Sequence, residues 1–261
     1  MSFEDTDEKW LKKIDRQTTK LFDRQGLDRK TQEKVFDPST LLVLAKLISD
    51  DVFETVDFPI SAGKEAFVFR AVTSEKKFVA IKIYRTSALV FKQLGNYIFG
   101  DPRFENINKN RRNLVFEWAK KEYKNLLRIQ KTQVKAPKPF ACIKNVVVMQ
   151  YIGSKQKPAP MLKDIPLENP QELAEQLFSY IKMMYEQAHL VHADFSAYNI
   201  LLFRKKPYVI DFGQAVLLSH PQASIFLQRD IHNCVQFFKK YDLDFDEHKL
   251  YQSMVHQRKN L

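Results

Sequence analysis

The sequence has few cysteines, few glycines and no long apolar run. Only Cys142 and Cys234 are cysteines among 261 residues, and they show no spacing pattern, so neither a disulfide framework nor a zinc site is expected. No apolar run approaches the length that crosses a bilayer, and the acidic start MSFEDTDEKW does not fit a secretory signal. We therefore expect a cytoplasmic protein with no membrane contact and no disulfide partner.

The composition is that of an ordinary globular protein with an excess of positive charge. Hydrophobic residues make up 44% and charged residues 28%, and the length suits one bilobal domain or two small ones. The formal net charge is +11, which favours polyanionic partners such as nucleic acid. A generally lysine-rich proteome would give the same charge, so both interpretations stay open.

The stretch 190–213, LVHADFSAYNILLFRKKPYVIDFG, places three polar residues among short apolar runs. Two strands joined by a turn at 205–207 are predicted to carry Asn199 and Asp211 to one end of a hairpin. An amide oxygen beside a carboxylate suits Mg²⁺ that is also held by nucleotide phosphates. Asp194, on the loop just before, can accept a hydroxyl proton during phosphoryl transfer.

The ordered set His-x-Asp, Asn and Asp-Phe-Gly is typical of the protein-kinase fold. Each tripeptide alone is a weak signal, but the three in this order and spacing are specific. The alternative is that the Asp and Asn residues only form turns and that Phe212 only fills the core.

The first part of the chain is predicted to be helical and to carry no chemistry. Residues 1–35 alternate charge with helically spaced apolar side chains, which predicts an amphipathic helix. Turn and N-cap residues at 37–40 precede a second, more buried helix over 41–48. We expect residues 1–55 to be an extension that packs on the following lobe.

Three antiparallel strands with two hairpins are predicted between Phe58 and Tyr84. The first turn contains a single glycine, so it is no glycine-rich loop, but Ser61, Gly63 and Lys64 could still bind phosphates there. Val68, on the second strand, is also expected in the nucleotide site.

Lys82 ends the run Val-Ala-Ile-Lys on the third strand, where kinases place the lysine that contacts the α- and β-phosphates. The alternative is an outward-facing, solvated lysine. A helix over 114–127 follows a long basic insert at 85–113 and supplies Glu122 as the partner of that lysine, with Glu117 in reserve. The insert is either functional or disordered.

Two further strands, 140–143 and 146–150, lead to a predicted hinge at 151–153. There the backbone groups of Gln150 and Ile152 can bind the adenine edge. Met149 would line that pocket or simply fill the core. The expected lobes are 56–150 and 151–261, the second with helices over 171–187, about 221–240 and 245–255.

The chain resembles the RIO family of atypical protein kinases, specifically its first subfamily, over residues 36–241. The segments that carry the resemblance are VFDPSTLLVLAKLI, ISAGKEAFVFRA, VAIKIYR, NYIFGDPRF, FEWAKKEYKNL, VMQYIG, LVHADFSAYNILL and VIDFGQAVLLSHPQASIFLQRD. The resemblance implies a small two-lobed α+β kinase fold, with an antiparallel sheet plus helix in the first lobe and a reduced, mainly helical second lobe.

The resemblance also implies ATP and Mg²⁺ as ligands, with Mn²⁺ as a possible substitute. Asp194 would be the catalytic base, and Asn199 and Asp211 would hold the metal. Lys82 and Glu122 would hold the phosphates, beside the phosphate loop at 61–64. The insert at 85–113 would be the family's flexible loop.

Two departures from ordinary protein kinases stand out. Ala193 replaces the arginine of His-Arg-Asp, which removes the usual clamp on a phosphorylated activation loop. No Ala-Pro-Glu follows Gly213, and too few residues remain for a full second lobe, so the helices that dock peptide substrates are expected to be missing.

Three functions remain open from the sequence. The first is a serine/threonine kinase that acts in maturation of the small ribosomal subunit, on protein and RNA of its precursor, with autophosphorylation. The second is an ATPase-driven binding and release factor on the same particle. The third is a small-molecule kinase, against which the loop at 61–66 and the basic insert argue.

Overall fold

The computed structural model describes residues 36–86, 97–98, 100–104 and 110–255. The helix expected over 1–35 lies outside the described residues. The chain divides into two compact units. The described residues of unit 1 are 36–86, 110–123 and 139–151, and those of unit 2 are 97–98, 100–104, 124–138 and 152–255.

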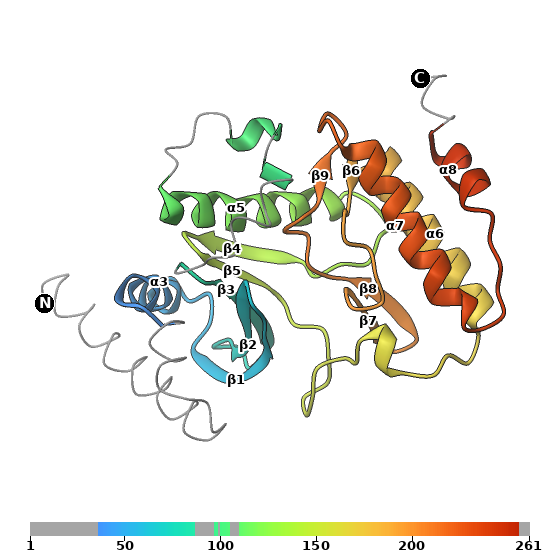
Figure 1. Ribbon diagram of the computed structural model, residues 1–261. Helices are drawn as coiled ribbons and strands as arrows, with labels where there is room; N and C mark the ends of the chain where they lie inside the picture. The colour runs from blue at the N-terminus through green and yellow to red at the C-terminus, as the bar shows by residue number, and fades with distance from the viewer. Residues whose placement is uncertain (1–35, 87–96, 99, 105–109, 256–261) are drawn as a thin grey trace, which may run out of the picture. The chain divides into compact units, whose positions relative to one another are not determined.

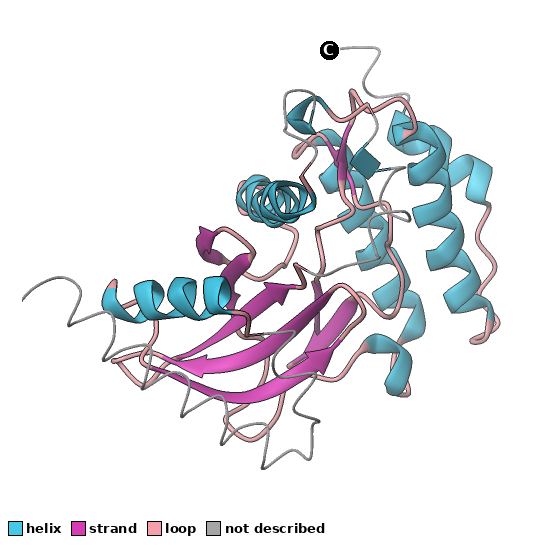
Figure 2. Ribbon diagram, turned by 60° about the vertical axis from the view of Figure 1, so that its left-hand side comes forward, coloured by secondary structure: helices cyan, strands magenta, loops and turns pink. Residues whose placement is uncertain are grey.

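Unit 1 is built on a five-stranded antiparallel sheet with the strand order β1-β2-β3-β5-β4 (Figures 1 and 2). Runs of Val, Ile and Phe separated by short polar turns account for these strands, and all five were expected. Their bounds are β1 Thr55–Ala62, β2 Ala66–Val72, β3 Phe78–Tyr84, β4 Pro139–Ile143 and β5 Val146–Gln150.

β3 is the central strand, and Lys82 is the fifth of its seven residues. Lys82 lies opposite Val68 of β2 on one side and Val147 of β5 on the other, and Val68 in turn lies opposite Ser61 of β1. Cross-strand partners share one face of a sheet, so Ser61, Val68 and Lys82 form a row on the same face.

Helix α3 (Pro38–Ser49) packs its apolar stripe on this sheet (Figure 2). The side chain of Asp37 caps the helix by accepting from the Thr40 backbone N–H at 2.7 Å. Leu44 and Leu47 have no exposed surface and belong to the core that α3 shares with β1, β2, β3 and β5.

Helix α5 (Arg111–Ile129) begins three residues before the expected start. Its residues up to Tyr123 group with unit 1 and the later ones with unit 2. Trp118 and Leu126 are buried, which agrees with the amphipathic pattern that predicted the helix.

Three helices form the bulk of unit 2, and they lie side by side (Figure 1). Two small antiparallel sheets, β6 with β9 and β7 with β8, flank the loops that carry the predicted site residues Asp194, Asn199 and Asp211. The bounds are α6 Pro170–Glu186, α7 Ala223–Lys239, α8 Glu247–Val255, β6 Leu190–Val191, β7 Ile200–Phe203, β8 Lys206–Val209 and β9 Val216–Leu217.

The turn expected at 205–207 is shifted by one residue. Arg204 and Lys205 form it, with φ of 52° and 61°, because a two-residue hairpin turn with positive φ matches the twist of its strands. Pro207 belongs to β8 opposite Leu202, whose N–H bonds to the Pro160 carbonyl instead, so a proline without an N–H is tolerated there.

Among the helices of the described residues, none is long and apolar enough to cross a membrane.

The packing of α3 on the sheet gives a first prediction. Leu44→Ala should lower the free energy of unfolding by about 2–5 kcal/mol, because it removes a buried side chain and leaves a cavity. Leu42→Ala on the same helix is the control, since Leu42 is 48% exposed and its loss should change stability by less than about 0.5 kcal/mol. Urea denaturation measures both, and equal effects would contradict the packing of α3 as part of unit 1.

Candidate active site

The loop after β6 brings Asp194 and Asn199 into direct contact. The Asn199 amide nitrogen donates to Asp194 Oδ2 and to the Asp194 carbonyl oxygen, each at 2.9 Å. These two bonds use the nitrogen of the amide and leave its oxygen as the group suited to a cation. The bond to Oδ2 also orients the half-buried Asp194 carboxylate.

A buried carboxylate on α7 holds the backbone of this loop. Asp230 accepts from the Ala193 N–H at 2.8 Å and from the Phe195 N–H at 2.9 Å, on either side of Asp194. Ala193 has a φ of 66°, a left-handed conformation that a residue with a Cβ rarely adopts. Asp230 therefore stabilises a strained backbone next to Asp194.

Burial shifts the pKa values of both carboxylates upward. For Asp230 the loss of solvent outweighs the two N–H donors and raises the pKa to about 7. For Asp194 burial is again the main cause of the raised pKa, and the Asp211 carboxylate adds to it. Asn199 and Arg229 act in the opposite direction on the pKa of Asp194.

Asp211 follows β8 at the end of the β7–β8 hairpin, beside the strand that starts after Asn199. The Ile210 N–H donates to the Asn199 carbonyl at 2.9 Å, and the His192 ring nitrogen Nε2 lies 3.1 Å from the Ile210 carbonyl. The hairpin therefore carries the Asn199 and Asp211 positions together. Asp211 also has left-handed backbone, with φ 62°.

An amide oxygen and a carboxylate are oxygen donors that suit Mg²⁺. Asn199 and Asp211 could hold such an ion together with phosphate and water oxygens, because Mg²⁺ usually takes only one or two protein ligands in nucleotide sites. Asp194, whose carboxylate bonds to Asn199, could then accept a proton beside the metal.

In unit 1, Lys82 forms a buried ion pair with Glu122 of α5. The Lys82 Nζ lies 2.8 Å from Glu122 Oε1, and the two side chains are 9% and 1% exposed. The Tyr84 hydroxyl donates to Glu122 Oε2 at 2.5 Å, so both carboxylate oxygens are bonded. The reserve candidate Glu117 pairs instead with Lys120 at 3.3 Å.

The expected phosphate loop is a closed turn between β1 and β2. The Gly63 N–H donates to the Ala66 carbonyl at 2.9 Å, and a Cβ on Gly63 would lie only 3.1 Å from that oxygen. Ser61 and Lys64 are exposed on this turn. Their hydroxyl and ammonium groups could therefore bind phosphates. Ser61 lies in the same cross-strand row as Val68 and Lys82.

The residues expected at the adenine edge lie on both sides of the unit boundary. Met149 is buried and Gln150 exposed at the end of β5 in unit 1, whereas Ile152 belongs to unit 2. The Ile152 carbonyl accepts from the Ala159 N–H at 3.0 Å, so its N–H is the better candidate for a ligand.

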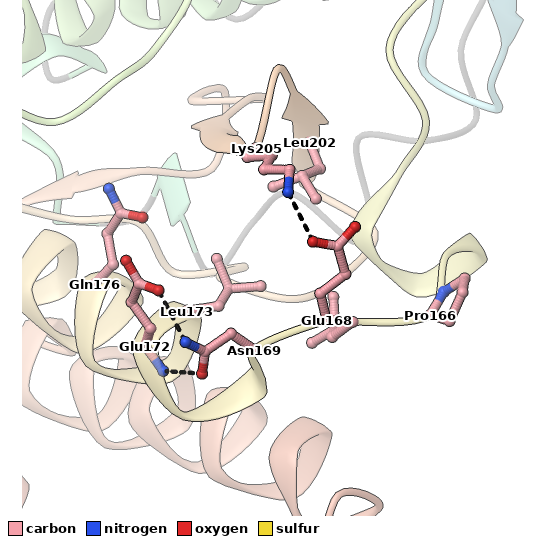
Figure 3. Close-up of a pocket in the computed structure, with 9 residues that line it drawn as sticks. Pro166, Glu168, Asn169, Glu172, Leu173, Gln176, Leu202 and Lys205 are labelled. Atoms are coloured by element: carbon pink, nitrogen blue, oxygen red, sulfur yellow. Dashed lines mark hydrogen bonds and ion pairs between the residues drawn. The ribbon is translucent and has the colours of Figure 1, made fainter.

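A pocket of about 410 Å³ in unit 2 contains none of the predicted site residues (Figure 3). Its polar side chains bond to one another, since Glu168 pairs with Lys205 at 2.8 Å and the Asn169 amide donates to Glu172 at 2.9 Å. The lining residues are Pro166, Leu167, Glu168, Asn169, Glu172, Leu173, Gln176, Leu202 and Lys205.

Three residues of the site escaped the sequence analysis. Tyr84 follows Lys82 by two positions on β3, and this same-face spacing was the available signal. The groups that Asp230 and Asn125 hold at the site are backbone N–H and C=O groups, for which no sequence pattern exists. Asn125 donates to the Phe212 and Ala215 carbonyls at 2.9 Å each.

The chain is similar in sequence to known proteins of one family. The RIO domain family matches residues 67–250. The RIO-type serine/threonine-protein kinase Rio1 of Haloferax volcanii is 40% identical over 223 residues, 85% of this chain and 77% of that protein. Rio1 of Thermoplasma acidophilum is 45% identical over 183 residues, 70% of this chain and 96% of that protein. Serine/threonine-protein kinase RIO1 of Homo sapiens is 39% identical over 220 residues, which are 83% of this chain and only 39% of the human protein.

Solved structures show the same fold. The Rio2 kinase–ADP/Mg²⁺–phosphoaspartate complex of Chaetomium thermophilum has a TM-score of 0.66 at 20% identity, over 84% of this chain and 67% of that chain. The Rio2 kinase of the same organism has a TM-score of 0.67 at 20% identity, over 83% and 68%. The expected kinase-like α+β fold is confirmed.

The contacts of Asp230 give the second prediction. Asp230→Asn should lower the free energy of unfolding at pH 8 by about 1–3 kcal/mol, because the amide leaves one of the two buried N–H groups without an acceptor. Gln228→Ala, an exposed position on the same helix, is the control. Chemical denaturation measures the difference, and wild-type stability of Asp230→Asn would contradict this account of the loop.

A third prediction concerns pH. Because burial raises the pKa of Asp230 from 3.8 to about 7, the folded chain binds this proton more tightly than the unfolded chain. The resulting stabilisation is complete below pH 3.8 and is lost as pH rises through about 7. Denaturation from pH 5 to pH 8 should therefore show a decline in the wild type that is smaller in Asp230→Asn. Parallel pH profiles of the two proteins would contradict it.

Proposed function

This chain belongs to the RIO family of serine/threonine protein kinases, in its Rio1 branch, and we propose that it transfers the γ-phosphoryl group of ATP in a Mg²⁺-dependent reaction. The observation that supports this most directly is the arrangement in unit 2. There one side chain, Asn199, bonds to the Asp194 carboxylate, and its backbone pairs with the residue before Asp211.

In the proposed reaction, Asp194 is the base. The hydroxyl oxygen of the acceptor forms a bond to the γ-phosphorus, the bond from phosphorus to the β,γ-bridging oxygen breaks, and its electron pair leaves with ADP. The Asp194 carboxylate takes the hydroxyl proton, and the bond from Asn199 keeps it oriented for this task. Mg²⁺ held by Asn199 and Asp211 would neutralise charge on the phosphate oxygens.

The row of residues on the unit 1 sheet supports nucleotide binding. Lys82 would contact the α- and β-phosphates, and Glu122 with Tyr84 holds its ammonium group in place. Ser61, with Gly63 and Lys64 on the same turn, would bind phosphates nearby. Val68, Met149 and the backbone of Gln150 and Ile152 would contact the base.

We also propose the small ribosomal subunit precursor as the partner, with autophosphorylation of the chain. The net charge of +11 supports an RNA-rich partner, because cationic surfaces bind polyanions. The arginine that clamps a phosphorylated activation loop in ordinary kinases is replaced by Ala193 in this chain. The proposed function therefore includes no activation by phosphorylation of that loop.

The fourth prediction separates base from metal ligand. Asp194→Asn should lower the rate of phosphoryl transfer by about 10²–10⁴ while ATP binding survives, because the residue takes a proton and does not hold the metal. Asp211→Asn should also weaken binding of Mg²⁺–ATP. Calorimetric titration with ATP, with and without Mg²⁺, and rates of label transfer measure both effects. Loss of nucleotide binding in Asp194→Asn but not in Asp211→Asn would reverse the assigned roles.

One experiment tests the proposed function itself. The chain is incubated with γ-labelled ATP and Mg²⁺, with and without small ribosomal subunits of the source organism. Label in protein and label released as phosphate are both followed, and Asp194→Asn is the negative control. The proposal expects label to accumulate on protein over repeated turnovers, dependent on Asp194.

The result also distinguishes the ATPase alternative. Free phosphate that exceeds protein label and rises with added subunits would favour an ATP-driven binding and release factor. Protein label that stops at about one phosphate per chain would point the same way. No transfer and no hydrolysis by the wild type would reject both functions.

A further inference from the structure

Asp211 holds a strained backbone that must be supported from outside its own hairpin. Its φ of 62° lies in the left-handed region, which is strained for a residue with a Cβ. Before Asp211, the Ile210 N–H bonds to Asn199. After it, the Phe212 and Ala215 carbonyls both accept from the side chain of Asn125, at 2.9 Å each.

Asn125 is fully buried, and its amide is used at both ends. Its nitrogen donates to the two carbonyls, and its oxygen accepts from Arg103 Nη1 at 2.8 Å. A reversed amide would face two carbonyl oxygens with an oxygen and would meet the guanidinium with an NH₂ group. Arg103 therefore selects the orientation in which Asn125 can hold the turn after Asp211.

The guanidinium group of Arg103 forms a bidentate ion pair with the buried carboxylate of Asp101. Its Nε lies 2.8 Å from Asp101 Oδ1 and its Nη2 lies 2.6 Å from Asp101 Oδ2. Asp101 Oδ1 also accepts from the Arg103 backbone N–H at 3.0 Å. Paired bonds of this kind fix the plane of a guanidinium group, which directs Nη1 at Asn125.

The segment that supplies Arg103, residues 97–104 without residue 99, is docked on α7 and the residues before it. Gly100 has φ 86°, and a Cβ there would lie 2.8 Å from the ring of Pro221, so only glycine fits. The Tyr97 ring stacks on Phe226 with centroids 5.2 Å apart. The Tyr97 hydroxyl accepts from Arg229 at 3.0 Å.

Arg229 extends this support to the loop of Asp194. Its guanidinium donates to the Ala193 carbonyl as well as to the Tyr97 hydroxyl. Ala193 stands where ordinary kinases have an arginine. The guanidinium group that contacts the loop of Asp194 belongs instead to Arg229. The guanidinium group of Arg103 acts on the turn after Asp211 by orienting Asn125. The loop of Ala193 and the turn after Asp211 are thus both connected to one docked segment.

We propose that Arg103 and Asn125 are positioning residues for phosphoryl transfer, which hold Asp211 in the backbone conformation that binds the metal. This inference rests on the proposed function, since it assumes Asp211 as a metal ligand. Neither residue is among those proposed to bind ATP or the metal. Their effect passes through the Phe212 and Ala215 carbonyls, so it should appear in the Mg²⁺ dependence of the reaction.

The test uses Asn125→Asp and Arg103→Gln in the full chain. Asn125→Asp keeps the shape of the side chain but cannot donate to the two carbonyls. Arg103→Gln removes the ion pair with Asp101. Arg128→Gln, an exposed arginine on α5, is the matched control. ATP turnover is titrated with Mg²⁺ at saturating ATP, and binding of ATP without metal and the melting temperature are measured in parallel.

Both variants should raise the Mg²⁺ concentration for half-maximal turnover by about 10-fold or more, as loss of groups that orient metal ligands commonly does. Affinity for metal-free ATP should change by less than about twofold, because unit 1 residues bind the phosphates in the proposed function. The double variant should show no more than the larger single effect, because the two side chains act in one chain of contacts.

Unchanged Mg²⁺ dependence in both variants would overturn the inference, even with a lowered melting temperature, and additive effects would overturn the link from Arg103 to Asn125. If Asn125→Asp does not fold, Arg103→Gln and the milder Arg103→Lys decide by the same titration. Absence of ATP turnover in the wild type would instead reject the proposed function.

Discussion

Left-handed backbone at two residues with side chains, Ala193 and Asp211, is the constraint on which the loops of unit 2 depend. Such backbone persists only where surrounding groups hold it. At Ala193 the Asp230 carboxylate binds the N–H groups on both sides of Asp194. At Asp211 the chain is tied after the turn by Asn125. These bonds hold the candidate base and metal ligand in place without touching either carboxylate.

Much of the fold could be predicted because its signals are local. Asp37 before an apolar helical stripe marks the start of α3, and short runs of Val, Ile and Phe mark the strands of the sheet. The order of Lys82 on a strand and Glu122 on the next long helix was enough to expect their pairing. The atoms of that pair lie 2.8 Å apart.

The rest could not be predicted, because it depends on bonds between distant side chains and ordinary backbone groups. Asp230 binds N–H groups some 35 positions earlier in the chain, and Asn125 binds carbonyls some 87 positions later. Nearly every residue type carries these backbone groups, so the sequence does not mark which of them is bound. The Arg204–Lys205 turn carries no glycine or asparagine to mark it, so the pattern placed it at the proline instead.

Helix α5 supplies side chains that support candidate site residues in both units. Glu122 and Asn125 lie three positions apart on it, the first bonded to Lys82 of the sheet and the second to the turn after Asp211. This one helix therefore supplies a support to a phosphate-binding candidate in unit 1 and another to a metal-binding candidate in unit 2. Arg229 of α7 already donates to the Ala193 carbonyl. An arginine at position 193 would place a second positive charge near Arg229, and like charges repel. Alanine at this position avoids that repulsion, and the guanidinium group beside the loop comes from α7.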